Sequence, residues 1–150
     1  MDKNGNTSLT GTALFLSAFF FGLYFINEGL FHYDSVILAK AVEDVYRTGH
    51  LQPAVGGRYG IVIINSILYF PFYCLGQNAD LMTRLSSVLF YALSIPSFFI
   101  FIKDLFEDHI QGFFAAILLA VTPFYLVPNT YGKEHGMSMF FFPLFDDPGQ

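Results

Sequence analysis

The sequence predicts an all-α polytopic membrane protein: a bundle of transmembrane helices with an amphipathic juxtamembrane helix in its first outer loop. Composition is the first observation, because 54% of the 150 residues are hydrophobic and 13% are charged, which is too apolar for an ordinary soluble domain. The second is the length of the uncharged runs, which approaches the roughly 20 residues that a helix needs to cross a bilayer. The third is a polar segment after the first run, in which apolar residues recur at helical spacing.

Uncharged runs of 18 residues predict the membrane spans, at 9–26, 85–102 and 110–127. At about 1.5 Å per residue, such a helix covers about 27 Å, close to the ~30 Å hydrocarbon core. The short acidic segment 104–109 joins the second and third runs, which are therefore expected to form a helical hairpin. Pro96 is a candidate kink in the second run.

The segment 35–48 predicts an amphipathic helix that is too polar to span and suited to the membrane surface. Asp34 precedes it and can cap the free N–H groups of its first turn, and Gly49 is a natural stop at its other end. Pairs with the i,i+4 spacing of ion pairs are Lys40 with Asp44 and Glu43 with Arg47.

The apolar run 60–75 leaves two topologies open. It has 16 residues and contains an asparagine, a serine and a proline, so it fits an interfacial, re-entrant or buried helix better than a full span. If it does not cross the membrane, the turns around Asp34 and Glu134 face the same compartment. If it crosses, these turns lie on opposite faces.

The last apolar run, 137–145, is an incomplete span. Its nine residues cannot cross a bilayer as a helix, and prolines and aspartates follow at once. We therefore expect the chain to be a fragment or truncated product of a longer membrane protein, and we expect no enzymatic activity from residues 1–150 alone.

Short motifs accompany this order of elements: His32-Tyr33-Asp34, Arg58-Tyr59, Ile64-Asn65-Ser66-Ile67, Leu75-Gly76, Arg84-Leu85-Ser86-Ser87, Thr122-Pro123 and the segment 131–136. Over residues 9–142, the motifs and the order of the elements resemble the GT-C membrane glycosyltransferases. The likeness is to the protein O-mannosyltransferase and lipid A aminoarabinose transferase branch.

The resemblance implies a multi-span helical fold that transfers a sugar from a polyprenyl-phosphate donor to a hydroxyl of a glycan, lipid or protein acceptor. It implies an active site at the extracytoplasmic face of the cell membrane, with Asp34 and Glu134 as its catalytic carboxylates. It also favours a non-crossing helix at 60–75. The family often has an Asp-Glu pair where this chain has Asp34-Ser35, and many members carry Asp at the position of Glu134.

Substrate binding is predicted for Arg58, Tyr59, Lys133 and His135. A carboxylate in a partly desolvated turn can take the proton of an acceptor hydroxyl, and a cation such as Arg58 or Lys133 can hold the departing lipid phosphate. Arg58 is equally suited to anchoring a lipid headgroup phosphate. The cofactor is left open: a divalent cation is compatible with the chemistry, but no residues have the spacing of a metal motif.

A non-enzymatic interpretation stays open beside this one. Taken singly, Asp34 fits a helix cap, Glu134 a solvated loop carboxylate and His135 a loop histidine, as in a transporter segment or an assembly subunit. Nucleic acid is a poor partner, because the net charge is −5 and no basic patch is present.

The charge distribution opposes the orientation that the resemblance implies. With the active site outside, five of the seven cations lie outside, which runs against the positive-inside tendency. The outer cations are Lys40, Arg47, Arg58, Arg84 and Lys133, and the inner ones are Lys3 and Lys103. An outer loop that handles a lipid phosphate has a reason to be basic.

Overall fold

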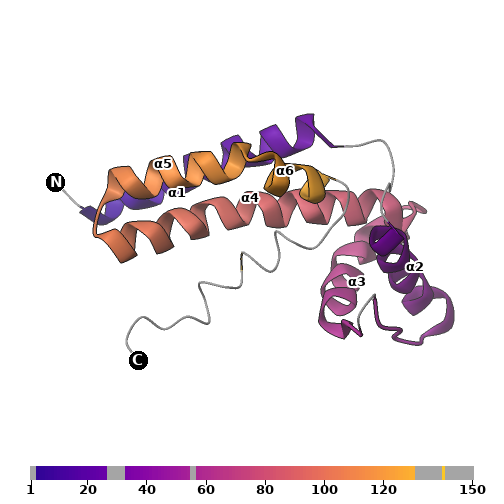
Figure 1. Cartoon of the computed structure of the whole chain (residues 1–150). Helices are drawn as coiled ribbons and strands as arrows, with labels where there is room; N and C mark the ends of the chain where they lie inside the picture. The colour runs from indigo at the N-terminus through magenta and orange to yellow at the C-terminus, as the bar shows by residue number, and fades with distance from the viewer. Residues whose placement is uncertain (1–2, 27–32, 55–56, 131–139, 141–150) are drawn as a thin grey trace, which may run out of the picture.

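The computed structural model describes residues 3–26, 33–54, 57–130 and 140, and these residues form an all-helical structure (Figure 1). The six helices are α1 (Lys3–Tyr24), α2 (Tyr33–Thr48), α3 (Tyr59–Cys74), α4 (Ala79–Phe106), α5 (His109–Val121) and α6 (Pro123–Thr130).

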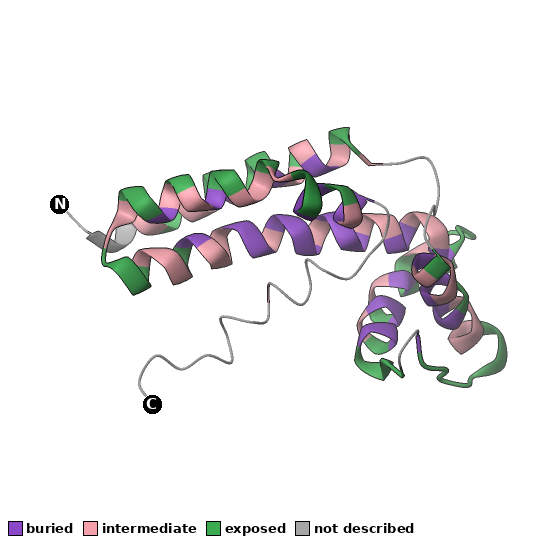
Figure 2. Ribbon diagram, viewed as in Figure 1, coloured by how far each residue is buried: buried purple, intermediate pink, exposed green. Residues whose placement is uncertain are grey.

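Helices α1, α4 and α5 lie side by side along one long axis and form a helical layer, with α6 against one end of it (Figure 1). Buried apolar side chains of α4 fill the contacts, among them Tyr91, Ile95 and Phe99. Gly112 lets α5 approach α4 closely, because a Cβ there would lie 2.9 Å from the carbonyl oxygen of Phe99. Figure 2 shows that α4 is buried along much of its length, whereas the outer sides of α1 and α5 are exposed.

Among the residues that the structure describes, two helices are long and apolar enough to cross a membrane: α1 over Thr7–Tyr24 and α4 over Ala79–Phe106. The bent pair α5 and α6 makes a third if both belong to one span. Large apolar side chains on the outside of the layer, such as Phe20 and Phe114, are exposed, as lipid-facing residues are. The chain is therefore an all-helical protein with two or three possible membrane spans.

The third predicted span, 110–127, is divided between two helices. α5 ends at Val121, and α6 begins at Pro123 with a bend of 54° between them. Thr122 between them is extended (φ −67°, ψ 120°), as expected for a residue whose αR conformation is disfavoured by a following proline. Pro123 itself stands at the first position of α6, where its missing N–H costs nothing.

Helix α4 is longer than the predicted span 85–102 at both ends. Its first two turns contain Asp80 and Arg84, whose side chains lie 3.0 Å apart with i,i+4 spacing. These charges end an apolar run but do not end a helix. The 28 residues of α4 measure about 42 Å at about 1.5 Å per residue, so α4 is longer than the ~30 Å hydrocarbon core.

Helices α2 and α3 pack against each other and against the first part of α4, at one end of the helical layer (Figure 1). Leu38 and Val42 of α2, Val62 of α3 and Met82 of α4 are buried in this core. Within the described residues, neither α2 nor α3 packs against α1, α5 or α6. The short helix α3 therefore does not run alongside the layer.

Candidate functional site

Asp34 lies in the first turn of α2 and is half-buried. The expectation that it would precede the helix as a cap is wrong, because Tyr33 is already helical. A carboxylate in the first turn still lies near the positive end of the helix dipole, where it is stabilising.

Arg58 and Tyr59 lie where α3 begins. The backbone carbonyl of Arg58 accepts a hydrogen bond from the N–H of Ala54 at 3.4 Å, which closes a short loop before the helix. Both predicted binding side chains are exposed, and Tyr59 is the first residue of α3. Lys133, Glu134 and His135 lie outside the described residues, as does the predicted incomplete span 137–145 apart from residue 140. The position of Glu134 relative to Asp34 therefore stays a prediction.

Helices α1 and α6, which precede the two acidic turns in the sequence, end at the same end of the layer. Near the end of α1, a Cβ on Gly22 would lie 3.2 Å from the ring of Tyr91 on α4. In α6, the ring of Tyr125 lies 5.7 Å from the same Tyr91 ring, measured between centroids. Figure 1 shows the ends of α1 and α6 at the end of the layer that is nearer to α2 and α3.

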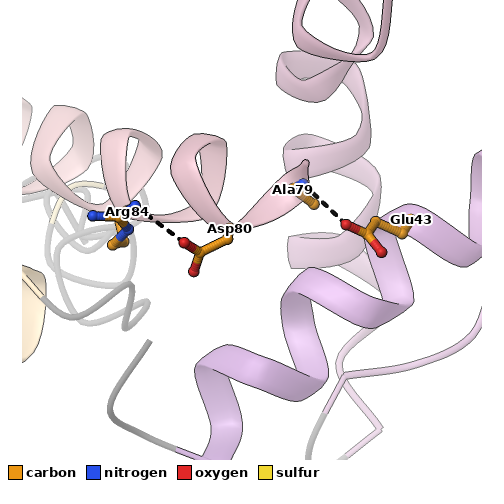
Figure 3. A network of polar contacts seen from close by, with 4 residues as sticks. All are labelled: Glu43, Ala79, Asp80 and Arg84. Atoms are coloured by element: carbon orange, nitrogen blue, oxygen red, sulfur yellow. Dashed lines mark hydrogen bonds and ion pairs between the residues drawn. The ribbon is translucent and has the colours of Figure 1, made fainter. Parts of the chain in front are cut away.

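Glu43 of α2 caps the first turn of α4. The backbone N–H of Ala79 donates to Glu43 Oε1 at 3.1 Å, and the Asp80–Arg84 ion pair follows along the same helix (Figure 3). The preceding residue, Asn78, makes no side-chain cap hydrogen bond. The carboxylate thus satisfies one of the free N–H groups of α4 and places negative charge at its positive end.

This contact replaces a predicted one. Glu43 was expected to pair with Arg47, and Lys40 with Asp44, but neither ion pair forms in the described part of the chain. The Glu43 carboxylate points to α4 instead, because a helix N-terminus offers it an unsatisfied N–H.

A polar hollow of about 270 Å³ lies where the ends of α2 and α3 meet the start of α4. We call it the junction hollow, and it is lined by Glu43, Arg47, Tyr69, Tyr73, Gly76, Gln77 and Asn78. The Tyr69 hydroxyl donates to the carbonyl oxygen of Gln77 at 2.8 Å. Burial, and then the nearby Glu43 carboxylate, raise the pKa of Tyr69 above its usual value of 10.0.

Buried polar groups join α3 to α4 behind this hollow. The Ser86 hydroxyl donates to Asn65 Oδ1 at 2.6 Å, and both residues are almost fully buried. Asn65 Nδ2 in turn donates to the carbonyl oxygen of Ile61 in its own helix. A hydrogen bond between two buried side chains fixes the register of the two helices, because any shift would leave polar groups unpaired.

The sequence did not reveal the junction hollow or the Glu43 cap, and the interpretation centred on the acidic turns around Asp34 and Glu134. Helix-end signals were nevertheless present. Gly76 adopts φ +68° and ends α3 with hydrogen bonds from Gly76 N to Tyr73 O and from Gln77 N to Phe72 O. A helix that begins directly after this stop has its unsatisfied N–H groups at 79–82, before the start of the apolar run at 85.

A metal centre is not assembled by the part of the chain that the structure describes, where no three His, Cys, Asp or Glu side chains form a group that could hold a metal ion. Comparison of the chain with protein-family models, with curated proteins and with solved structures finds no match. The fold thus defines a class, an all-helical protein with two or three helices able to cross a membrane.

Proposed function

We propose that the chain belongs to a membrane glycosyltransferase of the GT-C type, which moves a sugar from a polyprenyl-phosphate donor to an acceptor hydroxyl at the extracytoplasmic face. The observation that best supports this proposal is the common end of α1 and α6. Gly22 near the end of α1 and Tyr125 in α6 both lie against Tyr91, and both helices end at the end of the layer that is nearer to α2 and α3 (Figure 1). A two-carboxylate site at one membrane face needs this arrangement.

Helices α2 and α3 are assigned to the membrane surface in this proposal. α3 has 16 residues, or about 24 Å, and its packing partners in the described chain are α2 and the first part of α4. From Arg84 to Lys103, α4 covers about 28 Å, which matches the ~30 Å hydrocarbon core. The turns of α4 before Arg84 then lie at the outer surface with α2 and α3.

In the proposed reaction, Asp34 takes the proton of the acceptor hydroxyl as the oxygen attacks the anomeric carbon. The bond from that carbon to the polyprenyl phosphate breaks, and the phosphate leaves with the bonding electrons. Glu134 assists at the acceptor, and Arg58 and Lys133 neutralise the leaving phosphate. Tyr59 and His135 complete the binding surface for the sugar and the lipid headgroup.

Sugar transfer by the native full-length protein tests the role of Asp34. Membranes that contain the wild type, Asp34→Asn or Asp34→Glu are supplied with radiolabelled polyprenyl-phosphate mannose or polyprenyl-phosphate aminoarabinose. Loss of a general base lowers such rates by roughly 10²- to 10⁴-fold, so we expect this loss for Asp34→Asn and partial activity for Asp34→Glu. Asp44→Asn on the same helix is the matched control. Undiminished transfer by Asp34→Asn would reject Asp34 as the base, whereas no transfer by the wild type would favour a non-enzymatic assembly subunit.

Cysteine labelling tests the membrane placement separately. Cys74 is exposed at the end of α3, and His50 is exposed before its start, so the two positions bracket this helix. Single-cysteine variants carry the native Cys74, or His50→Cys or Glu107→Cys in a Cys74→Ser background. We expect an impermeant maleimide added outside to label positions 50 and 74 but not 107. Labelling of only one of positions 50 and 74 would show that α3 crosses the membrane.

A further inference from the structure

The junction hollow is distinct from the acidic turn that carries Asp34. Glu43, which lies on its wall, follows Asp34 by nine residues in α2, or about 13 Å along the helix axis. The hollow is lined by side chains of α2 and α3 and by residues 76–78 between α3 and α4, so its shape depends on how α2 packs against α3 and on this connecting segment.

Some polar groups of the hollow already form hydrogen bonds within the protein. Glu43 Oε1 accepts from the Ala79 N–H, and the Tyr69 hydroxyl donates to Gln77 O. Other groups have no hydrogen bond or ion pair within the described residues, and a ligand can use them. They are the guanidinium of Arg47, the hydroxyl of Tyr73 and the side-chain amides of Gln77 and Asn78.

These free groups supply both donors and acceptors. The guanidinium of Arg47 only donates, whereas the Tyr73 hydroxyl and the two carboxamides do both. The second oxygen of Glu43 adds another acceptor beside them. An array of mixed donors and acceptors matches vicinal hydroxyl groups, each of which donates one hydrogen bond and accepts others.

The charges of the hollow favour a neutral ligand. Arg47 and Glu43 lie one helical turn apart and have opposite charges, so their long-range fields largely cancel. A phosphate would gain the guanidinium but would meet the Glu43 carboxylate at close range. A polyhydroxylated ring meets no such repulsion.

Aromatic rings form one side of the hollow. Tyr73 lies 4.7 Å from Tyr46 and 6.1 Å from Tyr69, measured between ring centroids, and its side chain is 48% exposed. An accessible tyrosine ring offers an apolar face beside a polar hydroxyl, which suits the C–H face of a sugar. The volume of about 270 Å³ gives room for one ring rather than an extended chain.

We propose that the junction hollow is a binding site for a single neutral saccharide ring, held by Arg47, Tyr73, Gln77 and Asn78. The proposal rests on the geometry of α2, α3 and residues 76–78 and does not require sugar transfer at Asp34. If the transferase proposal also holds, the hollow would receive a sugar unit of the acceptor or donor that lies away from the reacting bond.

Saturation-transfer NMR on the whole chain in phosphatidylcholine nanodiscs tests this proposal. The probes are the methyl glycosides of glucose, mannose, galactose and N-acetylglucosamine, with inorganic phosphate as competitor. We expect transfer to at least one glycoside, a reduction of at least fivefold in Arg47→Gln and a smaller reduction in Tyr73→Phe. Lys40→Gln is the matched control, because Lys40 is an exposed cation of α2 outside the hollow. Circular dichroism checks that each variant keeps its helices.

Three results would overturn the proposal. The first is no transfer to any glycoside by the folded wild type. The second is a signal that Arg47→Gln leaves unchanged, which would place the sugar elsewhere. The third is displacement of the glycoside by inorganic phosphate at a concentration lower than that of the glycoside, which would identify an anion site. All three are independent of the transfer assay with Asp34→Asn, so the two proposals can fail separately.

Discussion

Replacing Glu43 by alanine should loosen the start of α4. The charged hydrogen bond from Ala79 N–H to Glu43 Oε1 would be lost, and removing a side-chain cap costs about 0.5–2 kcal/mol. Favourable charge at a helix end contributes about 0.3–1 kcal/mol when partly exposed, as Glu43 is. We therefore expect a loss of about 1–2 kcal/mol for Glu43→Ala. Glu43→Gln should lose about half of this, because it keeps the acceptor but removes the charge.

Hydrogen exchange measures this loss where it occurs. A change of about 1.4 kcal/mol is a factor of about ten in an opening equilibrium, so the amides at the start of α4 should exchange about tenfold faster in Glu43→Ala. Mass spectrometry of peptides that cover 77–86, with the protein in nanodiscs, reports the rate. Asp44→Ala is the matched control, and α5 peptides are the internal reference. Equal exchange in Glu43→Ala and Asp44→Ala would refute the capping role.

Two further predictions concern other contacts of α4 and the junction hollow. Gly112→Ala should destabilise the fold by about 1–3 kcal/mol in denaturant titrations, because its Cβ would lie 2.9 Å from Phe99 O. Gly11→Ala is the control and should be nearly neutral, because the nearest atom to its Cβ lies at 3.8 Å. Equal effects of the two substitutions would contradict this packing. The pKa of Tyr69 lies above 10.0, so its contribution to stability is full below pH 10 and is lost as the pH rises through the folded value. The difference in phenolate absorbance between the wild type and Tyr69→Phe should show Tyr69 titrating with a pKa above 10.0, and this pKa should be lower in Glu43→Gln. Titration of Tyr69 at its ordinary pKa in the wild type would disprove the shift.

Helix positions could be predicted because apolar runs and helical periodicity are local features. The segments expected at 35–48 and 60–75 differ by no more than two residues at either end from α2 and α3, and Gly49 ends α2 in a left-handed conformation as expected. The end of α5 was harder. A run defined by the absence of charge takes no account of a proline, and the restriction that Pro123 places on Thr122 decides where the helix breaks.

The start of α4 was missed for a different reason. Starting the span at residue 85 equated the start of an apolar run with the start of a helix, although Asp80 and Arg84 form an i,i+4 pair inside the same helix. The partner that caps this helix is 36 residues away in the sequence. Spacing within one segment cannot reveal a contact of this kind, since it depends on how α2 and α4 pack.

The packing of α2 against α4 links the structural and the functional proposals. Glu43 fixes one end of α2 to the start of α4, and Asp34 lies about 13 Å away along the same rigid helix. Asn65 of α3 and Ser86 of α4 form a buried hydrogen bond in the same region, and α2 packs against both helices. A relative shift of α3 and α4 would break this hydrogen bond, so the surface against which α2 packs is fixed. Under the transferase proposal, Glu43 is thus a positioning residue for Asp34. Loosening the cap would displace the carboxylate, and a displacement of only 1 Å can cost about 10²-fold in rate.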